Sequence, residues 1–206
     1  MSNRTLEFIL DFGSPNAYLS WRVLPALLQR TGATLMVTPC LLGGIFKATN
    51  NRSPMEAFGP VKGKMAYERM EMQRFIARHG LTEFRMNSHF PVNTLHLMRG
   101  AVAAQMEPDP AVFTRYLDVA MRGMWERSLK LDDPALLAAT LAESGLDAAR
   151  LGARMLDADV KQRLVDNTAA AVERGVFGIP TFLVGTEMWF GKDRLRDVED
   201  YLLAAG

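Results

Sequence analysis

Ser14 is the residue of this chain whose position best suits chemistry. It stands in the run Asp-Phe-Gly-Ser-Pro at positions 11–15, and apolar residues then recur at helical spacing until Gly32. A proline near the start and a glycine just past the end are typical of a helix. A residue at a helix N-terminus faces unpaired N–H groups and about half a positive charge. The Ser14 hydroxyl therefore either caps the helix or donates a hydrogen bond to an external thiolate held over the helix end.

A second candidate is the Ile179–Pro180 bond, in the run Gly-Ile-Pro-Thr before a short apolar segment. Only about 5–6% of X–Pro bonds are cis, so frequency alone favours trans. A cis bond there would be a deliberate backbone device, placed just before a strand that begins a hairpin.

A third candidate is the glycine turn at 190–194, Phe-Gly-Lys-Asp-Arg, which enters the last helical pattern. Its backbone N–H groups and Arg194 suit a carboxylate, and Asp193 suits an amine. The alternative is an ordinary helix, with Asp193 as its N-cap and Arg194 in solvent.

The elements that must position these residues follow from periodicity. Segments 5–12 and 34–39 read as strands around the helix that begins at Pro15, which makes a βαβ unit. Segment 41–60 has no lasting periodicity, and we expect it to be a loop. A hairpin with strands at 181–184 and 188–190 follows much later, and an amphipathic helix over 193–205 closes the chain.

Between these two parts only helical patterns occur. They cover 65–78, 94–106, 111–126, 134–144, 148–156 and 159–174. The order predicts an α/β thioredoxin-like fold with an all-helical insertion. We assign residues 1–45 and 166–206 to the thioredoxin-like domain and residues 46–165 to the insertion.

Composition excludes several classes of function. The 24 basic and 23 acidic residues nearly cancel, which argues against nucleic acid and membrane surfaces as partners. Cys40 is the single cysteine, so the chain has no dithiol of its own. The three histidines, His79, His89 and His96, lack zinc-like spacing, and we expect no metal site. No apolar run approaches 18 residues, so a soluble cytoplasmic protein is expected.

Four segments together, 12–18, 44–51, 175–182 and 190–194, resemble the 2-hydroxychromene-2-carboxylate isomerases. These enzymes belong with the kappa-class glutathione transferases in the DsbA-like branch of the thioredoxin fold. The resemblance covers almost the whole chain, with the motifs in the same order. It implies glutathione as cofactor, a small aromatic 2-oxo acid or hemiketal as substrate, and a homodimer.

The resemblance also assigns roles to residues. It implies that Ser14 meets the glutathione sulfur and that Ile179 pairs through its backbone beside a cis Pro180. Lys192 and Asp193 of the glycine turn would bind the γ-glutamyl end of glutathione, and Gly191 and Arg194 are expected to bind glutathione in the same turn. The substrate would contact Lys47, Asn51 and Arg52, with His89 and Phe90 in a loop that could reach its pocket. Arg52 is equally well read as a solvated loop charge, because the Asn50–Asn51 pair leaves the register open by one residue.

The implied reaction interconverts 2-hydroxychromene-2-carboxylate and trans-o-hydroxybenzylidenepyruvate in the degradation of aromatic hydrocarbons such as naphthalene. Glutathione thiolate would add to the substrate and leave unchanged. Three alternatives stay open: a kappa-type glutathione transferase, a DsbA-like oxidoreductase, and a non-catalytic scaffold that binds an extended peptide. The oxidoreductase is disfavoured, because Ser14 and Pro15 stand where its redox cysteines would be.

Overall fold

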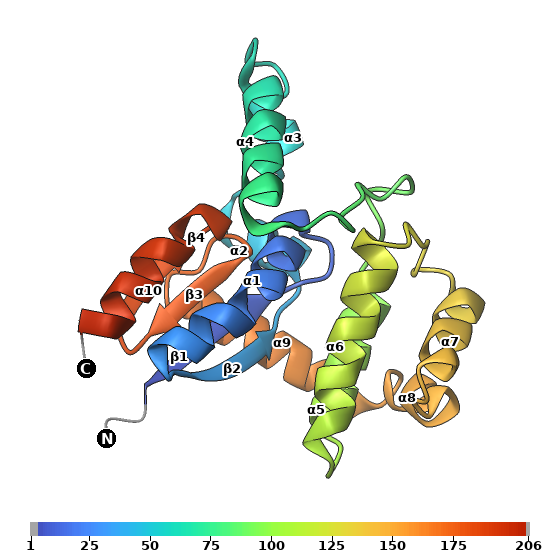
Figure 1. Ribbon diagram of the computed structural model, residues 1–206. Coiled ribbons are helices and arrows are strands. Elements are labelled where there is room, and N and C mark those ends of the chain that lie inside the picture. Colours follow the sequence, from blue (N-terminus) through green and yellow to red (C-terminus); the bar gives the residue numbers. More distant parts are fainter. Residues whose placement is uncertain (1–3, 205–206) are drawn as a thin grey trace.

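The computed structural model describes residues 4–204 and contains one four-stranded sheet. Its strands are β1 (Thr5–Leu10), β2 (Thr34–Pro39), β3 (Thr181–Val184) and β4 (Glu187–Phe190), in the spatial order β2-β1-β3-β4 (Figure 1). β1 and β2 are parallel, whereas β3 runs antiparallel to both β1 and β4. The sheet therefore joins the first forty residues to the last thirty. This is the thioredoxin-like fold that the sequence predicts.

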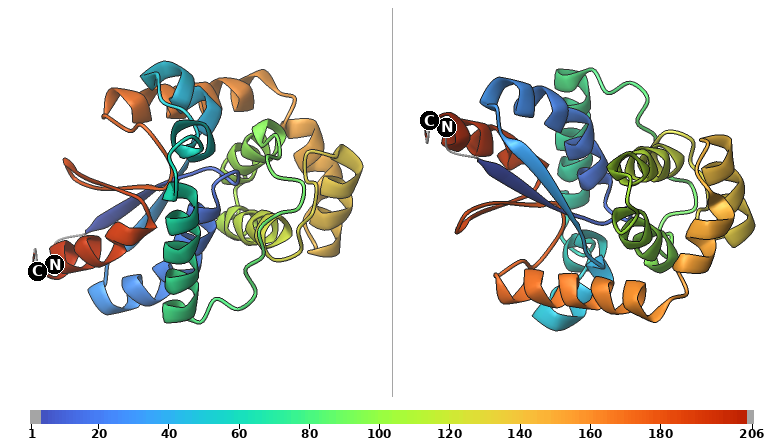
Figure 2. Two further views of the ribbon diagram at one scale, coloured as in Figure 1. Left: turned by 90° about the horizontal axis from the view of Figure 1, so that it is seen from above. Right: turned by 90° about the horizontal axis from the view of Figure 1, so that it is seen from below.

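Helices cover both faces of the sheet. α1 (Pro15–Thr31) and α10 (Leu195–Ala204) lie on one face, and α9 (Ala158–Glu173) crosses the other (Figures 1 and 2). α1 ends at Gly32, whose φ of 67° lies in the left-handed region that favours glycine. The predicted first strand ends two residues early, at Leu10, because residues 11–14 turn towards the helix.

The expected loop at 41–60 is wrong in part, because this segment contains two short helices. They are α2 (Leu42–Thr49) and α3 (Pro54–Phe58). α2 has only eight residues, two of them glycines, which hides its periodicity, and it ends at Asn50 with φ 54°. α3 begins with a capping box, in which Ser53 and Glu56 each accept from the other's backbone N–H.

The remaining helices lie in the segment predicted to be an insertion. They are α4 (Lys64–His79), α5 (Leu95–Gln105), α6 (Pro110–Trp125), α7 (Pro134–Glu143) and α8 (Ala148–Arg154). α4 projects away from the sheet, whereas α5 to α8 pack together beside it (Figure 1). The five helices confirm the helical patterns found in the sequence.

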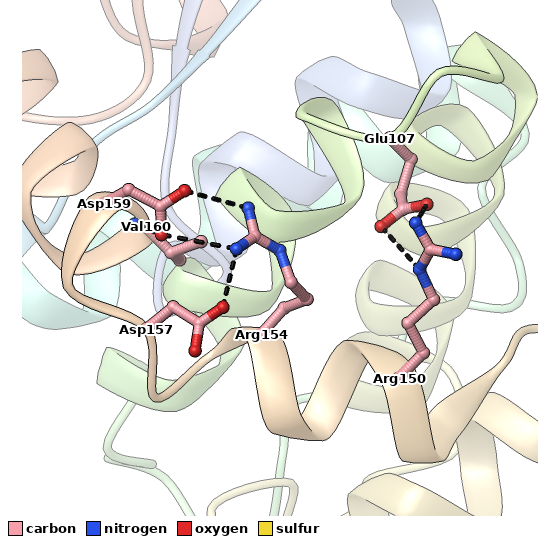
Figure 3. A network of polar contacts seen from close by, with 6 residues as sticks. All are labelled: Glu107, Arg150, Arg154, Asp157, Asp159 and Val160. Atoms are coloured by element: carbon pink, nitrogen blue, oxygen red, sulfur yellow. Dashed lines mark hydrogen bonds and ion pairs between the residues drawn. The ribbon is translucent and has the colours of Figure 1, made fainter.

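Ion pairs fix α8 within this group (Figure 3). Arg150 makes a bidentate ion pair with Glu107, which follows α5. The distances are 3.1 Å from Nε to Oε1 and 2.9 Å from Nη2 to Oε2. Arg154 binds Asp157 and Asp159 at the start of α9 at 2.6 and 3.0 Å. The insertion is thus tied by side chains to the helix that leads back to the sheet.

The two predicted domain boundaries, 45/46 and 165/166, fall inside α2 and α9. α9 packs against both β2 and α5, and the buried apolar residues form one continuous core. The division into two domains stays a prediction. Among residues 4–204, no helix has the length and apolar character needed to cross a bilayer.

Candidate active site

Ser14 is buried at the N-terminus of α1, with 5% of its surface exposed. Its Oγ accepts a hydrogen bond from the backbone N–H of Ala17 at 3.2 Å, which is the capping role. The same hydroxyl donates to the carbonyl oxygen of Ile179 at 3.0 Å. The cap is therefore confirmed, and the hydroxyl also bridges two segments 165 residues apart in sequence.

The Ile179–Pro180 bond is cis, so the trans isomer that frequency favours is wrong here. Two contacts hold this turn: Gly191 N–H donates to the Pro180 carbonyl at 2.9 Å, and the Thr181 hydroxyl donates to the Gly178 carbonyl at 2.7 Å. Thr181 then pairs with β1 and β4 in the sheet. The residue before the cis proline is thus placed beside Ser14 by the centre of the sheet.

Buried side chains fix the loop that leads to Ser14. The Asp11 carboxylate, which is fully buried, accepts from the N–H groups of Gly13 at 2.8 Å and Leu42 at 2.7 Å. Burial raises the pKa of Asp11, and these hydrogen bonds act in the opposite direction. From the insertion, the indole N–H of Trp125 donates to the Phe12 carbonyl at 2.9 Å. The loop is held by β1, by α2 and by α6.

The glycine turn of the third candidate segment forms a single 3₁₀ turn, η1 (Lys192–Arg194), entered through Gly191 at φ 95°. Lys192 is only 4% exposed, and its Nζ lies 5.2 Å from the centre of the Phe75 ring. Asp193, itself exposed, accepts from Lys192 Nζ at 2.6 Å rather than capping the turn. Arg194 is exposed and pairs with Asp197 at 3.2 Å.

Of the expected substrate residues, Asn51 is brought towards the cis-proline loop. Its Nδ2 donates to the Phe177 carbonyl at 2.8 Å, and its Oδ1 accepts from the N–H of Arg52 at 2.8 Å. Lys47 lies on the last turn of α2, and both it and Arg52 are exposed. Neither cation has an ion pair among residues 4–204.

The other two expected substrate residues lie before α5. Phe90 is half-buried, its ring centre 6.0 Å from that of Trp125, and the Phe90–Pro91 bond is also cis. His89 is exposed, and its backbone N–H donates to Asn87 Oδ1 at 2.8 Å. Phe90 thus packs on the indole that fixes the Ser14 loop, whereas the His89 side chain makes no hydrogen bond or ion pair with the described residues.

Comparison with known proteins agrees with the thioredoxin-like fold. The DSBA-like thioredoxin domain model matches residues 5–203. The chain belongs to this family. It is 28% identical over 194 residues to a 2-hydroxychromene-2-carboxylate isomerase of Pseudomonas putida, covering 94% of this chain and 92% of the relative. It is also 28% identical over 202 residues to glutathione S-transferase kappa 1 of Rattus norvegicus, covering 94% and 88%.

Solved structures place this DSBA-like domain in the same group. The structure of a 2-hydroxychromene-2-carboxylate isomerase superposes with a TM-score of 0.80 at 27% identity, covering 98% of this chain and 95% of that one. A probable DsbA oxidoreductase from Streptomyces coelicolor superposes with a TM-score of 0.74 at 17% identity, over 98% and 90%, which shows the shared fold alone. The curated relatives are thus isomerases and kappa-class transferases.

This DSBA-like domain has no reactive thiol. Cys40 is fully buried, its Sγ donates to the Asn167 carbonyl at 3.4 Å, and burial raises its pKa to about 12. Among the described residues, no group of three His, Cys, Asp or Glu side chains is placed to hold a metal ion. A thiolate placed beside Ser14 would therefore have to be supplied by a ligand, because Cys40 is the single cysteine of the chain.

Sequence reasoning missed three residues beside Ser14. Asp11 and Trp125 hold its loop, as described above. The third is Asn16, two residues into α1, whose Oδ1 is buried without a hydrogen-bond partner in residues 4–204. Asn16 stands in the same motif as Ser14, but only the fold reveals that its oxygen is buried and unpaired.

Proposed function

We propose that this chain is a glutathione-dependent isomerase that interconverts 2-hydroxychromene-2-carboxylate and trans-o-hydroxybenzylidenepyruvate. The observation that carries the proposal is the position of Ser14 Oγ at the N-terminus of α1, 3.0 Å from the carbonyl of Ile179 beside a cis proline. This is a place where a cysteinyl peptide can lay its sulfur on a helix end while its backbone pairs with Ile179. The choice of reaction is supported by an isomerase relative whose alignment covers 94% of this chain.

The contacts at this site can supply the free energy needed to lower the pKa of a bound thiol. A free thiol with a pKa of about 8.5 is only about 3% thiolate at pH 7, and lowering the pKa by two units requires about 2.7 kcal/mol. A hydrogen bond to a charged acceptor contributes about 1.5–3 kcal/mol, and a helix N-terminus about 0.3–1 kcal/mol. Ser14 together with α1 can supply this amount.

Binding of glutathione would have to redirect the Ser14 proton. In the structure that proton is donated to the Ile179 carbonyl. When the cysteinyl N–H of glutathione pairs with the same carbonyl, the Ser14 hydroxyl is released and can turn to the sulfur. The Ala17 N–H continues to donate to Oγ, which leaves the hydroxyl proton for the thiolate. Peptide pairing and thiolate support are then coupled through one oxygen atom.

When bound, glutathione would supply a thiolate nucleophile. The hemiketal substrate would open by cleavage of its ring carbon–oxygen bond, with its hydroxyl proton passing to the phenol oxygen, to give a cis alkene conjugated to a 2-oxo group. Reversible addition of the thiolate would make the alkene bond single so that it can rotate, and loss of the same thiolate would restore the double bond as trans and leave glutathione unchanged. Lys47 and Arg52 are the cations for the substrate carboxylate, with Asn51 beside them. Lys192 and Asp193 hold the γ-glutamyl end.

The test measures isomerisation with and without glutathione in the purified protein and in Ser14→Ala. We expect turnover to require glutathione. Ser14→Ala should lower kcat/KM by about ten- to a hundredfold, which corresponds to the loss of one hydrogen bond to a charged acceptor. Ser20→Ala is the matched control, because Ser20 is a buried serine on the same helix that donates only to the Asn16 carbonyl. Full glutathione-dependent turnover by a folded Ser14→Ala protein would refute the role of Ser14.

A kappa-type transferase is the second candidate, favoured by the 28% identity to the rat enzyme. It would use the same thiolate but release a conjugate, so product analysis with 1-chloro-2,4-dinitrobenzene separates the two reactions. A calorimetric titration that detects no glutathione binding at millimolar concentration would favour a non-catalytic scaffold. The homodimer and the cytoplasmic location also stay predictions, and analytical ultracentrifugation tests the first.

A further inference from the structure

A groove of about 310 Å³ lies between α2, α5 and α9. Most of its wall is aliphatic: Leu41, Ala48, Leu95, Leu164, Val165 and Val172. None of the candidate active-site residues lines it. Its lining is therefore separate from the residues proposed to bind glutathione and its substrate.

Two cations lie in this otherwise apolar wall. Arg99 comes from α5 and Lys161 from α9, and both are half-buried. Neither has an ion pair within residues 4–204, and none of the residues that line the groove is acidic. Burial without a counter-charge is unfavourable for a cation. The groove therefore presents two positive charges that an anion would complement.

The rest of the wall offers a ligand little polar contact. Thr168 is a polar residue of the wall, and its hydroxyl is already used, since it donates to the Leu164 carbonyl at 2.7 Å and accepts from the Leu41 N–H at 3.0 Å. No aromatic side chain lines the groove, so there is no ring on which a flat ligand could stack. A ligand that fits must carry a small anionic group and an aliphatic body.

We propose that this groove binds a medium-chain aliphatic monocarboxylate. The carboxylate would lie between Arg99 and Lys161, and Arg99 can offer it two parallel N–H donors. The chain would lie along the leucines and valines of α5 and α9. The volume is at the lower end of the range of about 300–1,000 Å³ for small-molecule sites, which suits a short chain better than a long lipid.

The test is titration of the ¹⁵N-labelled protein with octanoate, followed by amide NMR. We expect saturable shifts at Gly44, Ala48, Thr168 and Ala169, all in the wall of the groove. Arg99→Gln and Lys161→Gln should each raise the Kd about five- to tenfold. Arg163→Gln is the matched control, because Arg163 is an exposed cation on the same helix outside the groove, and it should leave the Kd unchanged.

Neutral 1-octanol separates charge recognition from simple apolar binding, because its affinity should be the same in all three variants. The proposal is overturned if octanoate does not saturate, or if its shifts gather around Ser14 instead of the groove. It is also overturned if Arg163→Gln weakens binding as much as Arg99→Gln, or if the groove resonances move with protein concentration alone, which would mean a second copy of the chain covers them. Ligand binding here does not depend on glutathione, so the result is independent of the proposed isomerase activity.

Discussion

The Ser14 loop and the side chains of Lys47, Arg52 and Asp193 belong to one candidate site but differ sharply in burial. Around Ser14 the polar groups are held by distant elements: Asp11 binds Leu42, Trp125 binds Phe12, and Ser14 binds Ile179. By contrast, the side chains of Lys47, Arg52 and Asp193 are exposed. One end of the site is fixed before a ligand arrives, and the other is open to solvent.

This difference suits the two tasks of the proposed reaction. Support of a thiolate needs a hydroxyl that is already in place and shielded from water, since electrostatic contacts are stronger there. Recognition of a substrate carboxylate can be done by flexible cations at the surface. Perturbing the buried end should therefore change stability and thiol chemistry together, whereas perturbing the exposed end should change substrate binding alone.

Trp125→Phe should give the largest effect, because it removes the donor to a buried carbonyl in the Ser14 loop while it keeps an aromatic ring. The unfolding free energy should fall by about 1–3 kcal/mol, the cost of an unsatisfied buried acceptor. Chemical denaturation measures this, and kcat should fall in parallel. Trp21→Phe is the control, since Trp21 is partly exposed and its indole N–H has no hydrogen-bond partner among residues 4–204. An equal loss in both variants would show that the indole N–H does not fix the loop.

The pH dependence of the Cys40 contribution to stability tests whether the core next to the Ser14 loop is shielded from solvent. The pKa of Cys40 is raised to about 12 from 9.0, so the folded state favours the neutral thiol, and the stabilisation it gives is complete below pH 9 and is lost between pH 9 and 12. The difference in unfolding free energy between the wild type and Cys40→Ala should therefore narrow by about 1 kcal/mol from pH 8 to pH 10. Titrating tyrosines are shared by both proteins and cancel. A difference that stays constant over this range would mean that the thiol is not isolated from solvent.

Asn16 refines the comparison, because its buried Oδ1 accepts no hydrogen bond from residues 4–204, whereas the other buried polar groups near Ser14 are hydrogen-bonded. A buried oxygen without a donor weakens the free protein, and a ligand that brings a donor would relieve it. Asn16→Ala should leave thermal stability unchanged or raise it, and it should weaken glutathione binding about three- to fivefold in calorimetry. A drop in melting temperature with unchanged affinity would instead indicate that water satisfies Asn16.

The sequence predicts the fold well, because periodicity and turn residues are local. The helix after Pro15, its end at Gly32, the hairpin and the helical insertion all follow from short segments. The two short helices at 42–58 are not predicted, because α2 contains two glycines and α3 spans only five residues. Local patterns of this length are too weak to predict a helix.

The surroundings of Ser14 are harder to predict, because its partners are distant in sequence. Nothing near Trp125 indicates that its indole will reach Phe12, 113 residues earlier. Likewise, a lysine in the glycine turn reads as a surface charge, whereas Lys192 is buried against Phe75 from the insertion. The motif identifies which residues matter, and only tertiary packing shows what holds them.

Lys47→Gln should give the smallest effect on activity. A small effect is what we expect of an exposed residue that binds substrate, in contrast to the buried residues around Ser14. Lys47 is exposed and has no ion pair in the described chain, so its attraction for a substrate carboxylate is screened by solvent and salt. We expect KM for the substrate to rise about two- to threefold, with glutathione affinity and unfolding free energy unchanged. The wild-type KM should rise with ionic strength, and that of Lys47→Gln should respond less. Lys62→Gln, another exposed lysine, is the control and should behave as the wild type. A large loss of kcat in Lys47→Gln would contradict the division of labour, because it would give an exposed side chain a part in the chemical step.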